Sequence, residues 1–500
     1  FKEPVQKIVS HRILAINRGE KEKYLQVKIS VPDDEIIEII KAEYIKKSSP
    51  TSNLMENAVE DAYKRLIWPS IEREIRNMLT EEAEEQALST FSKNLKHLIL
   101  QPPVKGRIIM GFDPAYRTGC KIAIIDASGK LLECTVCYPT PPQNKFDESK
   151  KIILDLIEKY QVDVISLGNG TASRESEKFL SEILKESSRP VSYVIVSEAG
   201  ASVYSASKLG TEEFPNLDVS FRGAVSIARR LQDPLAELVK IDPKSLGVGQ
   251  YQHDVNQKRL SEKLSAVVED CVNTVGVDVN TASPSLLSYV SGVSSSIALN
   301  IVKYREENGM FKSRKEFLKV PKLGPKTFEQ CAGFLRVPES SNILDNTAVH
   351  PESYDIAEKI MKLYTLEELK VKTFSENDIA QMASNLDIGI PTLRDILSEL
   401  KKPGRDPREE LPAPIFRTDV LEISDLKPGM VLTGSVRNIT DFGAFIDIGV
   451  HQDGLCHISE LSDGFVRSPF DVVSVGDVVR VKVLSADKER GRISLTMKGL

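Results

Sequence analysis

Short apolar runs alternate with amphipathic segments between residues 107 and 197, and no other feature of the sequence constrains the fold as strongly. Runs of this length, bounded by turn sequences such as PAYRTG and DASGK, are typical of strands. Segments with apolar residues three and four apart are typical of helices. The expected strands are 107–112, 121–125, 131–138, 162–168 and 191–197, and the expected helices are 146–160 and 172–186. The predicted element order is therefore β-β-β-α-β-α-β.

That order is the order of the ribonuclease H fold. The first strand carries Asp113, where nucleases of this fold hold their first metal-binding carboxylate. Hydrolysis by two metal ions needs several carboxylates around ions about 3.5–4 Å apart. The acids that could converge on Asp113 are Glu198, after the fifth strand, and Asp233 or Glu175. If they converge, the chain is a metal-dependent, structure-selective nuclease.

The carboxylate set is incomplete in the sequence. The fourth strand ends in LGNGT (167–171), which contains no acid. The late helix, RGAVSIARRLQDP, carries arginines where a metal site needs carboxylates: Arg222, Arg229 and Arg230. We therefore expect Asp113, Glu198 and Asp233 to be vestigial, and the domain to be catalytically inactive.

Asp113 has two further interpretations. It precedes Pro114, and Asp-Pro is a good start for a turn. Alternatively, the glycine-rich loop GNGTASRE (168–175) precedes a helix and, with Arg117, could hold an anion. CTVC (134–137) has a metal-like spacing but lacks the second pair that a zinc site requires. We expect no metal and no other cofactor.

The chain from residue 427 to the end is a series of short strands, and five strands of this kind fit a small closed barrel such as the OB-fold. In DFGAFIDIG, Phe442 and Phe445 flank a glycine where a bulge would bring both rings to one surface. Single-stranded nucleic acid stacks its bases on such rings, at about 1–3 kcal/mol each, while basic groups follow the phosphates. His457, Arg490 and Arg492 would complete this surface. The alternative is that both phenylalanines belong to the barrel core.

Two glycine turns precede helical segments between residues 286 and 334. The first, VSGV, contains Gly292. The second, PKLGPK, contains Gly324 between Lys322 and Lys326. A glycine turn before a helix exposes backbone N–H groups that hold a phosphate without reading the base. The tandem pair resembles a helix-hairpin-helix domain, although an ordinary helix connection would also need a glycine.

Residues 429–498 resemble an S1-type RNA-binding domain through KPGMVLTGSVRNITDFGAFIDIG and the HISEL element that follows. In that family, the positions that match Phe442, Phe445, His457 and a basic residue near Arg492 form the RNA face. The resemblance therefore favours the binding interpretation of the two phenylalanines over the core interpretation.

Several long motifs follow one another along the chain, and they include SHRILAINRGE (10–20), GFDPAYRTGCKIAIID (111–126), SEAGASVYSAS (197–207), VEDCVNTVGVDVNTAS (268–283), VHPESY (349–354) and KPGRDPR (402–408). Through these motifs and the S1-type barrel, the chain resembles the bacterial Tex family of transcription accessory proteins. This resemblance implies binding of nucleic acid without marked sequence specificity, a role in transcription and RNA as the main ligand. It also implies a YqgF-type ribonuclease H-like domain that is regarded as lacking nuclease activity.

The expected fold class is multi-domain α+β, in which a mostly helical scaffold carries a ribonuclease H-like α/β domain, tandem helix-hairpin-helix elements and a C-terminal OB-fold barrel of S1 type. The first region is expected to be the remainder of a truncated N-terminal part, because the chain begins with Phe1. The expected domains are a helical region (1–103), the YqgF-type domain (104–236), the helix-hairpin-helix domain (237–340), a small helical domain with a linker (341–416) and the S1 domain (417–500).

Single-stranded RNA and DNA are the expected partners of this chain. The net charge of −6 does not argue against them, because residues 301–330 hold eight Lys and Arg against four acids. An alternative is a scaffold that docks on RNA polymerase or the ribosome. No apolar run approaches the roughly 18–20 residues of a membrane span. With six cysteines in 500 residues, a reduced, cytoplasmic setting is expected, and we expect a monomer.

Overall fold

The computed structural model describes residues 2–45, 50–411, 413–418, 426–440, 442–450, 452–473, 477–487 and 492–500. The chain divides into two compact units, and each is described by itself. The first unit comprises residues 1–93 and 247–264, and the second comprises residues 94–246 and 265–500. Within the described ranges, no helix has both the length and the apolar character needed to cross a membrane.

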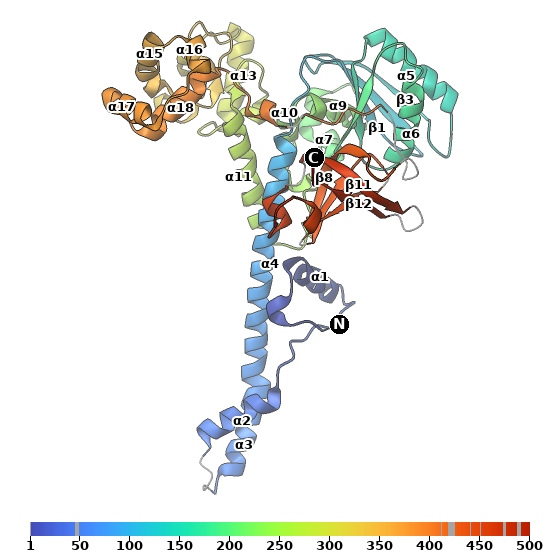
Figure 1. Cartoon of the computed structure of the whole chain (residues 1–500), viewed down its shortest axis with the longest axis vertical. Helices are drawn as coiled ribbons and strands as arrows, with labels where there is room; N and C mark the ends of the chain where they lie inside the picture. The colour runs from blue at the N-terminus through green and yellow to red at the C-terminus, as the bar shows by residue number, and fades with distance from the viewer. Residues whose placement is uncertain are drawn as a thin grey trace. The chain divides into compact units, whose positions relative to one another are not determined.

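The first unit is helical. It contains α1 (Ser10–Lys21), α2 (Asp33–Tyr44), α3 (Ser52–Ala62) and most of α4 (Trp68–Ile99) (Figure 1). The sequence predicts a kink or division of the helix near Pro69, and the structure places a π-helical turn, Tyr63–Ile67, between α3 and α4. Helical residues continue without a break from 52 to 99, so Pro69 lies inside the helix, directly after the π-helical turn that accommodates the residue without an N–H.

The second unit begins with a five-stranded sheet in the order β3-β2-β1-β4-β5. Its antiparallel meander is followed by two parallel crossovers, because β1 pairs in parallel with β4, and β4 with β5. This confirms the predicted β-β-β-α-β-α-β order. The strands are β1 (Ile109–Asp113), β2 (Cys120–Ile125), β3 (Leu131–Cys137), β4 (Val164–Gly168) and β5 (Ser192–Val196), with α5 (Phe146–Tyr160) and α6 (Ser173–Leu184) in the crossovers.

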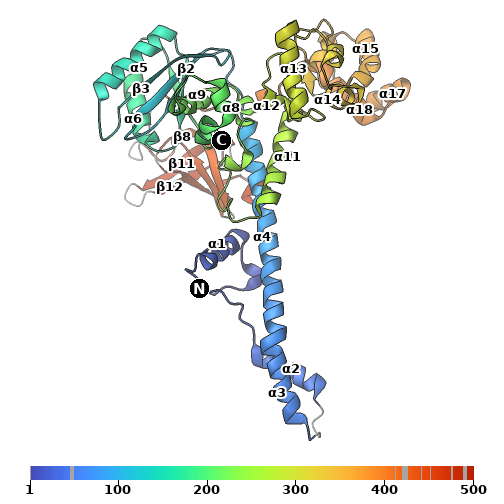
Figure 2. The ribbon, with the colours of Figure 1, turned by 180° about the vertical axis from the view of Figure 1, so that it is seen from behind.

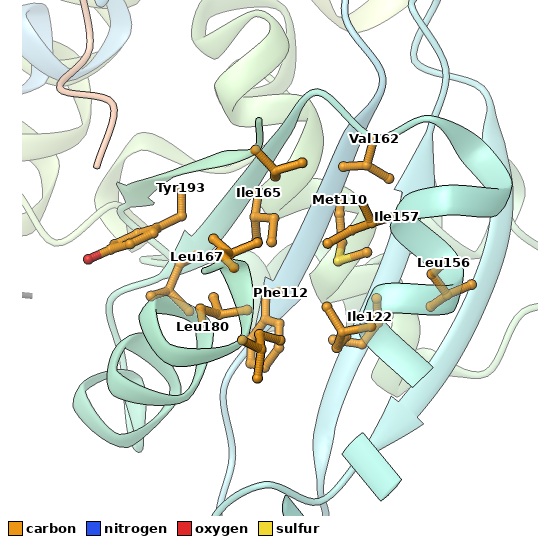
Figure 3. Packing of buried hydrophobic residues seen from close by; sticks show 14 of the residues in the cluster. Met110, Phe112, Ile122, Leu156, Ile157, Val162, Ile165, Leu167, Leu180 and Tyr193 are labelled. Atoms are coloured by element: carbon orange, nitrogen blue, oxygen red, sulfur yellow. The ribbon is translucent and has the colours of Figure 1, made fainter. Parts of the chain in front are cut away.

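The two faces of this sheet bury different helices, as Figure 2 shows from behind. Alternation along β1 sends Met110 and Phe112 toward the core that α5 and α6 cover (Figure 3). Ile109 points the other way, into the core made with α9 (Val219–Gln232). By the same alternation Asp113 belongs to the α9 face. A Cβ on Gly111 would lie 2.2 Å from the Ala224 carbonyl oxygen, so glycine allows α9 to pack directly on β1.

Short helices follow the sheet and join the later helical part of the second unit. The helix-hairpin-helix region follows the later part of α11 (Gln257–Val275) and contains α12 (Pro284–Leu287), α13 (Ser295–Asn308) and α14 (Pro325–Cys331). A further cluster buries apolar residues from α15 (Tyr354–Leu363), α16 (Leu366–Val371), α17 (Glu376–Leu386) and α18 (Ile390–Lys401). The remaining short helices are α7 (Ala201–Ala206), α8 (Lys208–Glu213) and α10 (Pro234–Leu238).

The C-terminal strands close into a barrel in the order β10-β12-β11-β8-β9, as the sequence predicts. Its core is one apolar cluster that includes Val436, Ile446, Val481 and Leu495. Closure leaves the outward positions of each strand free for binding. The strands are β8 (Val431–Thr440), β9 (Gly443–Asp447), β10 (Gly454–His457), β11 (Val478–Asp487) and β12 (Arg492–Thr496).

Candidate nucleic-acid interface

The two predicted aromatic residues meet on the barrel. The ring centroids of Phe442 and Phe445 are 6.1 Å apart, and the rings stand at 85° to each other. Phe442 is 48% exposed and Phe445 is partly buried, so neither belongs to the closed core. An edge-to-face pair of this kind presents one ring face for stacking while the other ring supports it.

Gly443 makes this arrangement possible. It pairs with His457 across β9 and β10, and a Cβ at position 443 would lie 2.3 Å from the Cys456 carbonyl oxygen. Only glycine lets the two strands approach this closely. The amide of Ile458 donates a 2.8 Å hydrogen bond to the Phe442 carbonyl oxygen, which fixes the backbone that carries the first ring.

His457 is exposed beside the aromatic pair. Its Nδ1 accepts a hydrogen bond from the Ser459 amide at 3.3 Å and lies 3.0 Å from the Ser459 hydroxyl oxygen. Because Nδ1 accepts, a neutral ring carries its proton on Nε2, and that N–H is available to a ligand.

Strand register identifies the rest of the surface. Phe445 lies opposite Asn438 of β8 on one side and Leu455 of β10 on the other, and Leu455 lies opposite Ser494 of β12. Arg492 is two residues from Ser494 on the same strand, so both side chains point outward, and both are exposed. Arg492 therefore lies on the outward face that carries Phe445. Arg490 lies outside the described residues.

Asn438 and Leu455 are members of this face that the sequence analysis did not single out. Asn438 is exposed and Leu455 is partly exposed. The alternation of Leu455 with the buried Cys456 was a signal in the sequence. The pairing with Phe445 was not visible there, because it depends on the register of β9 against its two neighbours.

The two hairpin turns differ in backbone conformation. Gly292 has a φ of 79°, and a Cβ there would meet Gln330 at 2.7 Å, so the first turn requires glycine. In the second turn the left-handed residue is Lys322, with a φ of 70°, while Gly324 has a φ of −84° and no atom within 4 Å of an added Cβ. Lys322, Gly324 and Lys326 are all exposed, so this turn presents positive charge at the start of α14.

The carboxyl edge of the five-stranded sheet brings together Asp113 and Glu198. The Asp113 carboxylate lies against the backbone of α9, 3.0 Å from where a Cβ on Gly223 would be. The Glu198 carboxylate lies against Gly168 and Gly170. Burial, and next the charge of Glu198, raise the pKa of Asp113 to about 6. Burial also raises the pKa of Glu198.

The other candidate acids are engaged elsewhere. Asp233 caps α10 through the Ala236 amide and forms a 2.7 Å ion pair with Arg408. Glu175 accepts a 3.0 Å hydrogen bond from the hydroxyl of Tyr116. In the part of the chain that the structure describes, no group of three His, Cys, Asp or Glu side chains is placed to hold a metal ion. These donors do not fit the two-metal site that the fold supports in nucleases.

An arginine lies where a further carboxylate would be needed. Arg230, on α9, is buried and donates through Nη1 to the Ser197 carbonyl oxygen at 2.6 Å and to that of Ala199 at 2.8 Å. Among the described residues, its Nε and Nη2 have no hydrogen-bond partner, nor has Oε2 of Glu198.

A ribonuclease H-like domain, helix-hairpin-helix turns and an S1-type barrel in one chain define a class of multi-domain proteins built from folds that bind nucleic acid. The matching family models are described as Tex central region-like (residues 1–91), Tex protein YqgF-like domain (107–232), helix-hairpin-helix motif (272–336), HHH domain (342–408) and S1 RNA binding domain (425–498). The chain belongs to the Tex family.

Whole-chain relatives agree with these matches. An uncharacterized protein, YdcI, of Bacillus subtilis is 55% identical over 99% of this chain and 70% of its own length. The transcriptional accessory protein Tex of Neisseria gonorrhoeae is 49% identical over 99% of this chain and 66% of its own length. The human S1 RNA-binding domain-containing protein 1 is 39% identical over 99% of this chain and 57% of its own length. The chain thus spans 57–70% of the length of these relatives.

Proposed function

We propose that this chain is a non-enzymatic transcription accessory factor that binds single-stranded RNA, and also DNA, with little sequence specificity. The observation that carries the proposal is the outward face of the barrel, where Phe442, Phe445 and His457 lie close together and Arg492 lies farther along the same face. Rings accept any base by stacking, and the cation follows the phosphates, so such a face gives affinity without base readout. The family membership and the S1 and helix-hairpin-helix matches support the same function.

The two hairpin turns contribute contacts with the sugar–phosphate backbone in this proposal. Lys322 and Lys326 flank the exposed start of α14. Contacts of this kind position a strand and carry no sequence information. The ribonuclease H-like domain serves as a scaffold.

The test of the barrel face is a binding measurement with single-stranded RNA. Phe442→Ala combined with Phe445→Ala is expected to weaken binding by a few kcal/mol, on the order of 100-fold in Kd, because both rings leave the face. Phe465→Ala is the matched control, since Phe465 is a 97% exposed phenylalanine on another loop of the same barrel. Unchanged affinity in a folded double variant would remove the barrel face from the proposal.

The salt dependence of the same affinity tests the phosphate contacts. Because bound cations release counterions from nucleic acid, the logarithm of the affinity should fall linearly with the logarithm of the salt concentration. Removing Lys322 and Lys326 together should make that slope shallower by about one to two. A flat titration in the wild-type chain would argue against binding through phosphates.

A metal-dependent nuclease is the second candidate, and the convergence of Asp113 and Glu198 favours it. The test is a cleavage assay with Mg²⁺ or Mn²⁺ on single-stranded RNA, duplex DNA and a four-way junction. Under our proposal every substrate is retained and none is cut. Metal-dependent cutting that disappears in Asp113→Ala would establish the nuclease instead.

A further inference from the structure

One face of α9 closes the carboxylate edge of the ribonuclease H-like sheet. Gly223 lies against Asp113, and Ile227 lies one turn later, near the Glu198 carboxylate at Gly168. Arg230 follows after three more residues, so all three side-chain positions lie on the same side of the helix. Asp113, Glu198 and Arg230 therefore face a common space from β1, from the segment after β5 and from α9.

The backbone around the two carboxylates is made of glycines. A Cβ on Gly223 would lie 3.0 Å from Asp113 Oδ2, and one on Gly168 would lie 2.9 Å from Glu198 Oε2. A Cβ on Gly170 would lie only 1.5 Å from Glu198 Oε1 and would overlap that oxygen. Both carboxylates are therefore held close to peptide groups, where a side chain on any of these three glycines would crowd them.

Three buried polar atoms of Arg230 and Glu198 have no partner among the described residues: Arg230 Nε, Arg230 Nη2 and Glu198 Oε2. Arg230 is 3% exposed, and Oε1 of the buried Glu237, whose charge also acts on Arg230, lacks a partner as well. A buried charge without compensation is costly, so two partly buried carboxylates at one edge require a cation nearby. In ribonuclease H-like nucleases that cation is a metal ion.

We propose that the guanidinium of Arg230 is the resident cation of this edge, so that Asp113 and Glu198 are charge-balanced without a divalent metal ion. Nη1 is tied to the carbonyl oxygens of Ser197 and Ala199, which keeps the charge in place. Nε and Nη2 remain free to reach the carboxylates directly or through water. An incoming Mg²⁺ or Mn²⁺ would meet a fixed positive charge instead of a third carboxylate.

The charges around Arg230 keep it ionised. Burial lowers its pKa to about 10, while Glu237, Glu198 and Asp113 all act to raise it. At neutral pH the side chain therefore stays protonated. The two other arginines of α9 do not share this role, because Arg229 pairs with Glu213 at 2.9 Å and Arg222 donates to the carbonyl oxygen of Ser205. Lys121 of β2 also acts to lower the pKa of Asp113, but its ammonium donates to the Thr118 hydroxyl and to the carbonyl oxygens of Thr118 and Gly119.

This inference rests on the scaffold role given above to the ribonuclease H-like domain, and its test uses no nucleic acid. Failure of RNA binding and failure of the cation assignment are therefore distinguishable. The experiment measures Mn²⁺ binding to the whole chain by electron paramagnetic resonance and by calorimetry. The variants are Arg230→Met, Arg230→Lys, Asp113→Asn, Arg230→Met with Asp113→Asn, and Arg229→Met as the matched control on the same helix.

Arg230→Met should gain a Mn²⁺ site at least tenfold tighter than any site in the wild type, and adding Asp113→Asn should abolish it. Arg230→Lys keeps the charge, and Arg229→Met leaves the edge untouched, so neither should gain the site. A wild-type Mn²⁺ site that disappears in Asp113→Asn would overturn the proposal. So would a folded Arg230→Met that binds no Mn²⁺.

If Arg230→Met does not fold, neutralising its partners decides the question. Combining it with Asp113→Asn and Glu198→Gln should restore the thermal unfolding transition, because neither carboxylate of the edge then carries a charge. Failure of that triple variant to fold would show that Arg230 is needed for the carbonyl oxygens of Ser197 and Ala199 or for the buried Glu237, and not for the edge, and the proposal would fall.

Discussion

At the scale of a single residue, the partly buried Asp113 carboxyl group should make the stability of the sheet depend on pH. Its pKa is raised from 3.8 to about 6, first by burial and then by Glu198. The folded state therefore binds this proton more tightly than the unfolded state does, and stability falls as pH rises through this range. Between pH 4 and pH 7 the free energy of unfolding of the wild type should therefore fall by about 2 kcal/mol relative to that of Asp113→Asn. Hydrogen exchange of peptides covering β1 and β2 measures this difference.

Asp126, directly after β2, is the control for Asp113, because its stability contribution should change with pH in the opposite direction. Its carboxylate accepts hydrogen bonds from the Ser128 hydroxyl, the Ser128 amide and the Lys130 amide, and these lower its pKa. Its contribution is present above the ordinary pKa and is lost on acidification. Asp126→Asn should therefore destabilise the sheet more at pH 7 than at pH 3. Equal pH slopes for the two variants would contradict the environments described here.

Single residues also show a limit of the sequence analysis. The late helix was expected to place arginines where a metal site needs carboxylates, but its periodicity did not say which of them reaches the sheet edge. In the structure, Arg222 donates a hydrogen bond to Ser205, Arg229 donates one to Glu213, and Arg230 donates one to the loop after β5. Asp233, an acid in the predicted set, is occupied by Arg408, which lies 175 residues away in sequence. Partners this distant leave no local signal.

At the scale of paired strands, the close approach of β9 and β10 at Gly443 should determine both barrel stability and RNA affinity. In Gly443→Ala the new methyl group would overlap the Cys456 carbonyl oxygen at 2.3 Å, so β9 must move away from β10. We expect a loss of about 1–3 kcal/mol in barrel stability, as for other overpacked sites. RNA affinity should fall as well, because Phe445 and His457 lie on the two strands that separate. Hydrogen exchange of β9 and β10, together with RNA titration, measures both effects.

Gly464→Ala is the matched control for that prediction. Gly464 lies in a loop of the same barrel, and an added Cβ there would have no atom within 4 Å. Stability and RNA affinity should stay at wild-type values. Equal losses in the two variants would mean that the close approach of β9 and β10 does not determine the binding face.

At the element scale, the predictable part of the fold is the part encoded by local periodicity. The β-β-β-α-β-α-β order and the five barrel strands follow from alternation and turn residues. The row formed by Asn438, Phe445, Leu455 and Ser494 depends on register across four strands, and a bulge between Val436 and Asn438 shifts that register. Likewise, the left-handed residue of the second hairpin turn is Lys322, although composition favours Gly324.

At the scale of the second unit, Arg417 joins the barrel to the ribonuclease H-like sheet. Its backbone forms two 2.9 Å hydrogen bonds with Tyr193 of the edge strand β5. Its side chain forms ion pairs with Glu177 of α6 at 3.3 Å and with Asp447 of β9 at 3.2 Å. All three side chains are mostly buried, so their charges are removed from water. The two carboxylates therefore depend on the Arg417 guanidinium for compensation.

Arg417→Ala should destabilise the contact between the barrel and the sheet by about 3 kcal/mol, because it leaves the Glu177 and Asp447 carboxylates buried with fewer partners. The expected result is at least tenfold faster hydrogen exchange in both β5 and β9. Arg394→Ala is the matched control, since Arg394 pairs with Glu376 on an exposed surface of α17 and α18, where ion pairs contribute little. RNA affinity should change far less than in the Phe442 and Phe445 double variant, because the outward face of the barrel stays intact. Faster exchange in β9 alone would mean that Arg417 stabilises only the barrel and does not hold it to the sheet.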